Sequence, residues 1–395
     1  MRRVTLAVLA AAALLAASKG AGLPASAPRG AAPPGAAARD SEGYRLAVPR
    51  FTFRFPADHA AHPSFRTEWW YYTGHLDGTS QEPARSRVRA LPRAGFGYEC
   101  TFFRVALPVR EPSRSAWRAR DVIFMHLALT DEKAGVFRHF STASRAALAL
   151  AGADSTRYAV WLGDAGAGLA PDGRTHLLHG SGRDFGLALQ LLPAKPPVAH
   201  GSGGVSQKTA GRGNASHYYS ITRMTTRGHI VRGSDTIAVA GSSWMDHEFG
   251  SGRLGHTHTG WDWFSVQLED GRELMLYRLR LREGGVEPLS SGTLVAADGS
   301  ARHLALAEFD TRATGTWKSP HTGGTYPSGW VVRVPGEHLE LVLEPTVLDQ
   351  ELVVASMGGL AYWEGSVRVR GTSGGTPVGG RGYVELTGYA GVSPF

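Results

Sequence analysis

Residues 273–282 read Glu-Leu-Met-Leu-Tyr-Arg-Leu-Arg-Leu-Arg, so charged and apolar side chains alternate after Tyr277. Successive side chains of a β-strand point to opposite faces, which places Arg278, Arg280 and Arg282 on one face. The intervening leucines lie on the other face. This period of two predicts a strand with one solvated face and one buried face.

The same alternation recurs along most of the chain. It is found in residues 51–55, 339–344, 365–371 and 383–387. Asp-Gly pairs are typical of the tight turns that join such strands, and they occur at residues 77–78, 172–173, 270–271 and 298–299. Many short alternating strands separated by turns predict antiparallel barrels or sandwiches. We therefore expect an all-β protein.

The first 18 residues have the composition of a signal peptide. Arginines at positions 2 and 3 precede an apolar run that ends at Ala17, and this run is too short to span a bilayer. Residues 19–42 are rich in Ala, Pro and Gly, and such a segment cannot bury enough surface to become ordered. We expect a cleaved signal peptide and a flexible, disordered leader. The mature protein would then be exported, periplasmic or secreted, with no integral membrane segment.

The remainder of the 395-residue chain is long enough for two domains. Residues 195–214 are rich in Gly, Pro and Ser, which indicates a linker or a long loop. We place an N-terminal domain at residues 43–205 and a C-terminal domain at residues 206–395. The single cysteine excludes an intramolecular disulfide. The net charge of +8 comes mainly from scattered arginines, so we expect no nucleic-acid partner.

Four motifs are more specific than this alternation. They are residues 66–76 (RTEWWYYTGHL), 124–131 (FMHLALTD), 243–250 (SWMDHEFG) and 260–264 (GWDWF). Together they resemble the AttH/CrtC-like family, which groups secreted predicted hydrolases with carotenoid 1,2-hydratases. The resemblance extends over roughly residues 45–390 of the chain.

The resemblance implies a tandem of two lipocalin-like, calycin-type antiparallel β-barrels or sandwiches, with an apolar pocket at or near their contact. It also implies an apolar small molecule, lipid- or terpenoid-like, as the ligand. An enzyme of this kind would be a hydratase (a lyase) or a hydrolase. Family members accompany transporter permeases, so an ABC-type export system is a further expected partner. We assign no cofactor.

The hydratase branch relies on a His-x-aromatic pair and a later aromatic-x-Asp pair. These fall here on His217 with Tyr219 and on Trp244 with Asp246, and the two aromatic types are exchanged relative to the hydratases. A carboxyl group in apolar surroundings stays protonated near neutral pH and can protonate an alkene. The resemblance therefore implies that Asp246 is the acid.

The other candidate residues would assist this acid. His217 or His247 would orient or deprotonate the incoming water, and Glu68 is a second candidate carboxylate. Aromatic faces can stabilise a carbocation by about 0.5–2 kcal/mol each. The candidate substrate-binding residues are Tyr219, Trp244, Trp261, Trp263, Trp70, Tyr72 and His126.

Two alternatives stay open. Asp246 could instead accept backbone N–H bonds in a turn, with the tryptophans as ordinary core residues. The protein could also be a non-catalytic lipocalin-type carrier or chaperone of an apolar ligand. We assign no metal, because His247-Glu248 is followed by Ser251 where a zincin motif needs a second histidine.

Overall fold

The computed structural model describes residues 38–78, 95–108, 115, 117–252, 257–354 and 359–391. The expected signal peptide and most of the expected leader lie outside these ranges. The last residues of the leader do have defined contacts, because Arg39 bridges to Arg45 and Arg66 pairs with Asp40 and Glu42. The described part of the chain thus begins before residue 43.

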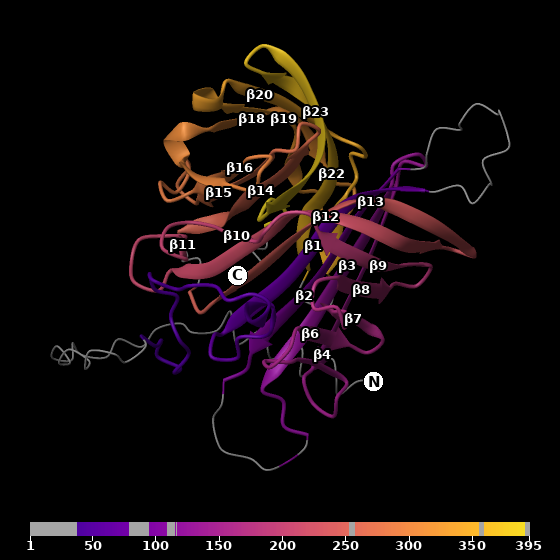
Figure 1. The fold of residues 1–395 in the computed structure, drawn as a ribbon, viewed down its shortest axis with the longest axis vertical. Helices are drawn as coiled ribbons and strands as arrows, with labels where there is room; N and C mark the ends of the chain where they lie inside the picture. The colour runs from indigo at the N-terminus through magenta and orange to yellow at the C-terminus, as the bar shows by residue number, and fades with distance from the viewer. Residues whose placement is uncertain are drawn as a thin grey trace.

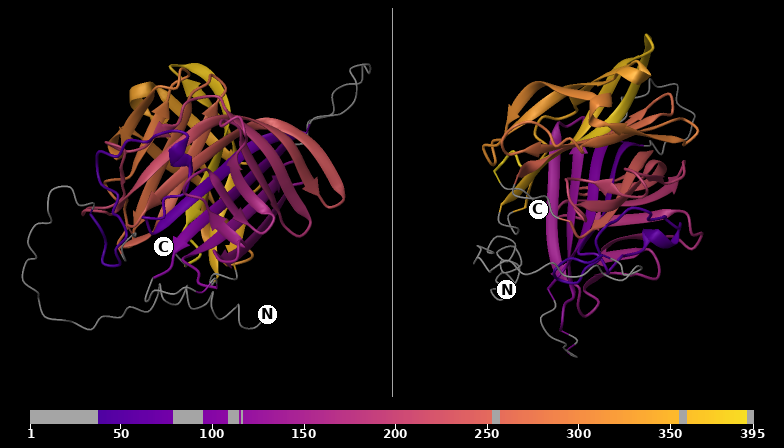
Figure 2. Two further views of the ribbon diagram at one scale, coloured as in Figure 1. Left: turned by 60° about the horizontal axis from the view of Figure 1, so that its bottom comes forward. Right: turned by 90° about the vertical axis from the view of Figure 1, so that its left-hand side faces the viewer.

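The first sheet has 13 antiparallel strands and curls around its own core (Figure 1; Figure 2). Its strand order is β4-β3-β2-β1-β13-β12-β9-β8-β7-β6-β5, with β10 and β11 paired to β12. The strands are β1 (Thr67–Gly78), β2 (Gly95–Ala106), β3 (Asp121–Asp131), β4 (Val136–Arg145), β5 (Ala151–Ala153), β6 (Ala159–Leu162), β7 (Ala165–Leu169), β8 (His176–Ser181), β9 (Phe185–Pro193), β10 (Val198–Ala199), β11 (Ser206–Gln207), β12 (Ala215–Arg232) and β13 (Asp235–Gly250).

The second sheet has ten antiparallel strands and also encloses its own core, with Leu276, Trp330 and Trp363 among the buried residues. Its order is β17-β16-β15-β14-β23-β22-β20-β19-β18, with β21 paired to β22. The strands are β14 (His258–Leu268), β15 (Glu273–Leu281), β16 (Ser291–Val295), β17 (Ala301–Ala305), β18 (Asp310–Lys318), β19 (Thr325–Val334), β20 (Leu339–Pro345), β21 (Glu351–Val354), β22 (Leu360–Ser373) and β23 (Thr376–Thr387).

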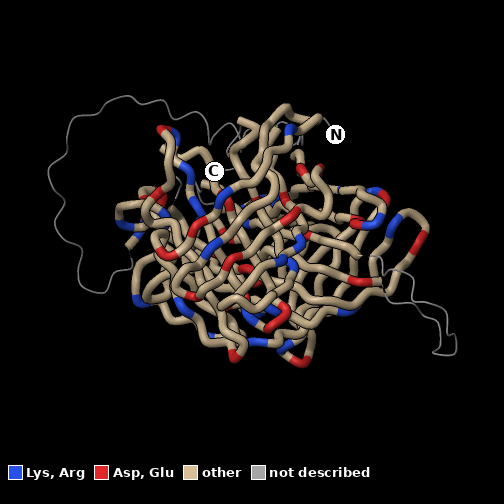
Figure 3. The backbone as a smooth tube through the Cα atoms, turned by 90° about the horizontal axis from the view of Figure 1, so that it is seen from above, with Lys and Arg blue, Asp and Glu red and all other residues tan. Residues whose placement is uncertain are grey.

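The all-β prediction with two curled antiparallel sheets is confirmed. The helices in the described part of the chain are three short 3-10 turns, η1 (Ala57–His59), η2 (Leu306–Glu308) and η3 (Pro335–Glu337). Within the same part of the chain, no helix is long and apolar enough to cross a bilayer. Basic and acidic residues are interspersed along the backbone of both sheets (Figure 3).

Strand β1 is buried on both faces because it lies between the two cores. Trp70 and Tyr72 point into the first core. Trp69 and Tyr71 point the other way, into an aromatic cluster shared with the second sheet. This double burial explains why the strand reads as an unbroken aromatic run rather than as alternating polar and apolar residues.

The two sheets pack directly against each other through this aromatic cluster. Tyr71, Tyr218 and Trp244 from the first sheet meet residues of the second sheet there, including Trp263. A close approach occurs at Gly97 of β2, where an added Cβ would lie 2.6 Å from the Cβ of Ser366 and 2.7 Å from the Tyr383 hydroxyl. A larger residue at position 97 would separate the strands at this point.

Two expectations differ from the structure in detail. Residues 51–55 form no strand. The rings of Phe53 and Phe55 instead pack against Tyr219, so the alternation in this segment reflects ring contacts without backbone pairing. The Gly-, Pro- and Ser-rich segment leads into β12, which still belongs to the first sheet. The change of sheet falls between Gly250 and His258, later than the boundary placed at residues 205 and 206.

Candidate functional site

The candidate residues divide between the two faces of β12 and β13. Asp246 and His247 are neighbours on β13, so their side chains point to opposite sides of the first sheet. Asp246 faces the aromatic cluster between the sheets. His247 faces the first core, where it lies opposite Tyr219 in the strand register.

Asp246 is held by three donors in the contact between the sheets. Tyr218 donates its hydroxyl to Oδ2 at 2.7 Å, and Trp244 donates its indole N–H to Oδ1 at 2.5 Å. Ser220 donates a short hydrogen bond to the same Oδ1. The indole N–H of Trp263, from the second sheet, donates to the Tyr218 hydroxyl at 3.1 Å. The turn alternative does not describe this carboxyl group, because these bonds come from side chains on strands.

Burial raises the pKa of Asp246 to about 7, although hydrogen bonds from Ser220, Tyr218 and Trp244 act in the opposite direction. A carboxyl group with that pKa is present in both forms near neutral pH, so it can deliver a proton and take one back. The aromatic rings around it are the kind of surface that stabilises positive charge. The chemistry available to this carboxyl group is therefore proton transfer beside aromatic rings.

Three further carboxyl groups lie in the same contact between the sheets, where Glu99 and Glu364 are buried and Glu385 is partly exposed. Glu364 and Glu385 lie directly opposite each other on β22 and β23, and Glu99 lies on β2. Burial raises the pKa of Glu99 to about 8 and that of Glu385 to about 7, and it raises the pKa of Glu364 well above its usual value. Tyr71 donates to Glu364 at 2.7 Å. In the folded state the contact between the sheets therefore favours the protonated, neutral form of these three groups.

The free energy of unfolding is expected to decrease as pH rises from about 6.5 to about 8. In the folded state Glu99, Glu385 and Asp246 keep much of their proton occupancy in this range, whereas in the unfolded chain such groups ionise at their ordinary pKa values of 3.8 to 4.5. The folded state thus binds more protons, which makes stability fall with pH. We expect a loss of about 1 kcal/mol or more per pH unit, measured by denaturant titration at several pH values.

Buried histidines act in the opposite sense where an imidazole in the unfolded chain holds a proton, an effect that is at half its size near pH 6.5 and becomes small above about pH 7.5. Burial lowers the pKa of His59, His126 and His200 to about 3, so each stays neutral in the folded state throughout the chosen range. Glu385→Gln is expected to flatten the slope, and Glu344→Gln, in an exposed ion pair, is the matched control. A flat profile in the wild-type protein would contradict protonated carboxyl groups at the contact.

Glu68 lies in a second group, on the face of the sheet that looks into the first core. Its Oε1 is 2.9 Å from His62 Nδ1 and 2.9 Å from His247 Nε2, and Arg104 Nε donates to its Oε2 at 3.0 Å. Burial opposes ionisation, but hydrogen bonds to His247 and His62 and the charge of Arg104 hold the pKa of Glu68 far below its usual value. Glu68 is therefore a permanently ionised group rather than an acid.

The hydrogen-bonded chain continues from His247. The Tyr219 hydroxyl lies 3.1 Å from His247 Nδ1 and 2.6 Å from His59 Nδ1. The ring of Trp70 stacks on His247 with centroids 4.9 Å apart. The hydroxyl of Tyr72 lies 2.8 Å from His176 Nδ1. These residues belong to one polar and aromatic group on the core face of the sheet.

The sheet therefore separates Asp246 from two of its expected partners, His217 and His247. His217 donates through Nδ1 to the Gly204 carbonyl oxygen at 2.8 Å, and its ring stacks on Phe51 with centroids 4.0 Å apart. It shares the core face with His247, away from Asp246.

The aromatic and polar candidates also separate. His126 bonds Tyr362 of the second sheet at 2.7 Å, and Trp261 donates to Glu385 at 3.1 Å. Trp244 and Trp263 lie with Asp246, and Trp261 packs against the same aromatic cluster.

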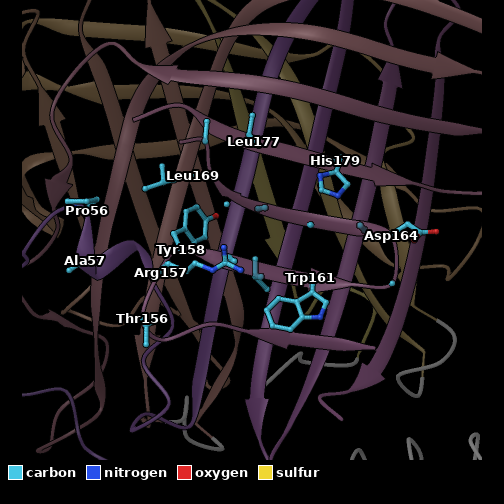
Figure 4. A pocket seen from close by; sticks show the side chains of 18 residues that line it. Pro56, Ala57, Thr156, Arg157, Tyr158, Trp161, Asp164, Leu169, Leu177 and His179 are labelled. Atoms are coloured by element: carbon cyan, nitrogen blue, oxygen red, sulfur yellow. The ribbon is translucent and has the colours of Figure 1, made fainter. Parts of the chain in front are cut away.

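A pocket of about 930 Å³ opens on another part of the first sheet (Figure 4). Its lining includes residues of η1 and of strands β6 to β8, with Tyr158, Trp161, Leu177 and His179. Asp246 does not line it. The Tyr158 hydroxyl bonds that of Tyr72 at 2.6 Å, which connects this pocket to the polar group in the first core.

Sequence reasoning missed several members of both groups. The His-x-aromatic motif did not point to Tyr218 or Ser220. It pairs His217 with Tyr219, and the side chain of Tyr219 faces the first core rather than Asp246. His200, whose Nε2 lies 2.6 Å from Ser220 Oγ, fell in the segment interpreted as a linker. The spacing of His62 and Glu68 matches no motif that would have linked them. Only the strand register brings these residues together.

Comparison with known proteins gives three results. A family model described as AttH-like matches residues 46–389. The crystal structure of an AttH from Nitrosomonas europaea has a TM-score of 0.75 and 33% identity, and the match covers 87% of this chain and 99% of that one. The AttH/CrtC-like resemblance predicted from the four motifs is thus confirmed. No curated protein matches the chain.

Two more distant structures share the fold alone. Kievitone hydratase from Nectria haematococca has a TM-score of 0.64 and 15% identity, with 90% of this chain and 97% of that chain covered. CghA has a TM-score of 0.51 and 12% identity, with 90% of this chain and 99% of that chain covered.

Proposed function

Since the chain belongs to the AttH-like family, we propose that it adds water to an apolar, lipid- or terpenoid-like molecule, or hydrolyses one, with Asp246 as the acid. One observation carries this proposal. Asp246 is a buried carboxyl group with a pKa raised to about 7, held among aromatic side chains where the two sheets meet. The name of its fold relative, kievitone hydratase, gives an example of hydration on this architecture.

In the proposed hydration Asp246 gives up one proton and later takes one back. The Asp246 carboxyl transfers its proton to one carbon of a C=C bond, which leaves a carbocation on the other carbon. The rings of Trp244 and Trp263 stabilise that cation, by about 0.5–2 kcal/mol each. Water then bonds to the cation through oxygen, and its released proton returns to the Asp246 carboxylate. Tyr218, Ser220 and Trp244 keep the carboxylate in position during the ionised interval.

A second candidate function is that of a non-catalytic carrier working beside an ABC-type export system. The pocket of about 930 Å³ favours it, because this pocket has apolar lining residues such as Leu169 and Leu177 and does not include Asp246. A carrier needs only a site that holds the ligand. Export of the mature protein suits both functions.

Incubation in water enriched in oxygen-18 separates the two functions. The purified full chain would be supplied with linear isoprenoid alcohols, with fatty-acid esters, and with the lipids extracted from the protein itself. An enzyme gives a product that carries solvent oxygen, identified by mass spectrometry as a hydrated molecule or as a cleaved ester. Bound lipid that is recovered unchanged, with no labelled product from any of these compounds, would rule out the enzyme and leave the carrier.

A further inference from the structure

Three potential metal ligands converge on the core face of the first sheet. They are His62 from the segment before β1, Glu68 from β1 and His247 from β13, and their ligating atoms all lie within 4.8 Å of one another. We infer that this cluster binds one divalent transition-metal ion, for which Zn²⁺ is the appropriate probe. Two imidazoles and one carboxylate are ligands that Zn²⁺ uses in proteins.

The spacing of the three groups is close to what a metal ion requires. Both His62 Nδ1 and His247 Nε2 lie 2.9 Å from the same oxygen, Glu68 Oε1. Ligands at the usual zinc distances in tetrahedral geometry are about 3.3 Å apart. An opening of a few tenths of an ångström at these two contacts, with the two imidazole nitrogens already within 4.8 Å of each other, would replace the two hydrogen bonds by metal–ligand bonds.

Each ligand is oriented by a second partner. His62 Nε2 lies 3.4 Å from Asp58 Oδ1, and His247 Nδ1 lies 3.1 Å from the Tyr219 hydroxyl. Arg104 holds Glu68 Oε2 at 3.0 Å, which directs Oε1 towards the two imidazoles. Metal-ligating histidines in proteins commonly have such partners on the other ring nitrogen.

The two imidazole rings are also fixed by packing. His62 stacks on Phe249 with ring centroids 3.7 Å apart and an interplanar angle of 9°, and His247 stacks on Trp70 at 4.9 Å. A ligand set that is already oriented loses little conformational freedom when the ion binds. The structure thus supplies this set without rearrangement of the backbone.

The local charge suits a divalent cation. Asp58, Glu68 and Asp121 carry three negative charges, and Arg104 carries one positive charge, bonding both Glu68 and Asp121. With neutral imidazoles, two negative charges remain to be balanced. A divalent ion would balance both, and Arg104 would keep its two carboxylate partners.

Access to the cluster is through His62. Glu68 and His247 are fully buried, whereas the His62 side chain is 15% exposed. Three protein ligands leave a fourth position for water, as in zinc sites that are not purely structural. The cluster and Asp246 lie on opposite faces of β13, so this inference does not depend on the proposed function.

Zinc titration of the tag-free, chelator-treated full chain tests the inference. Isothermal titration with Zn²⁺ is expected to saturate at one ion per chain. His62→Gln is expected to weaken binding by about tenfold or more, since even the loss of an orienting partner costs about 10–100-fold. His321→Gln removes an exposed histidine that pairs with Asp349 elsewhere and is the matched control. Its affinity should equal that of the wild-type protein.

Cobalt supplies an independent readout. Co²⁺ bound by two imidazoles, one carboxylate and water should give visible d–d absorption without a thiolate charge-transfer band, since Cys100 is buried on β2 and is not among the three ligands. His62→Gln should lose this absorption, and its circular dichroism should match the wild type because the residue is near the surface. Equal Zn²⁺ binding by wild type and His62→Gln, or no saturable binding by the wild type, would overturn the inference.

Discussion

Asp246→Asn is expected to reduce kcat by about 10²–10⁴-fold, the range over which a positioned general acid contributes. Asparagine has nearly the same shape, and its amide oxygen can still accept from Tyr218 or Ser220, but it cannot supply a proton. Steady-state kinetics on the substrate identified with labelled water would measure the loss. The wild-type kcat/KM should also fall as pH rises through about 7, because the acid must be protonated. The variant should lack that dependence.

Two controls distinguish a loss of turnover caused by the missing acid from one caused by misfolding. Asp77→Asn alters a partly exposed carboxylate of β1 that pairs with Arg381, and it should leave turnover unchanged. The folding of Asp246→Asn would be checked by circular dichroism and by denaturant unfolding above about pH 7, where ionisation of the wild-type carboxyl group itself opposes folding. Turnover by Asp246→Asn comparable to that of the wild type would remove Asp246 from the mechanism.

Arg104→Met is expected to lower the free energy of unfolding by about 3–5 kcal/mol, the usual cost of removing one partner from a buried ion pair. Arg104 is 2% exposed and its partner Glu68 is fully buried. The guanidinium also donates to Asp121 and to the carbonyl oxygens of His62 and Phe65. Methionine fills similar space but leaves these acceptors without their donor. Guanidinium chloride unfolding followed by tryptophan fluorescence would measure the change.

The matched control is Arg370→Met. Arg370 forms a two-contact ion pair with Glu344 on the outer face of the second sheet, where the arginine is 67% exposed. Exposed pairs contribute about 0–1 kcal/mol. A loss for Arg104→Met no larger than that for Arg370→Met would mean that the buried pair does not stabilise the first sheet.

The period of two in the sequence was enough to predict the fold class. Residues 273–281 and 376–387 form strands as the alternation indicated. The alternation also determines which residues of a strand share a face, such as Trp70 and Tyr72 of β1. It could not identify what each face would contact. Glu385 alternates with apolar residues like a solvated side chain, yet it lies partly buried in the contact with the first sheet, where its pKa rises to about 7.

The candidate site was predictable only in part for the same reason. Asp246 and Trp244 lie two residues apart on one strand, so their proximity follows from the sequence. His217 lies on another strand, and its face relative to Asp246 depends on the register of β12 against β13, which pairs Ser220 with Asp246. A motif names residue types and spacings. It does not specify a register between strands that are joined through a turn at Gly233.

Asp246 and His247 are adjacent in the chain, but their side chains lie on opposite faces of the first sheet and in different surroundings. Losing or gaining a single residue within the last third of β13 would exchange them, placing an imidazole among the tryptophans and a carboxyl group beside Glu68. Length variation among relatives should therefore concentrate at the hairpin tip near Gly233. Between Trp244 and Phe249, relatives should share the same residue count even where the residue types have diverged.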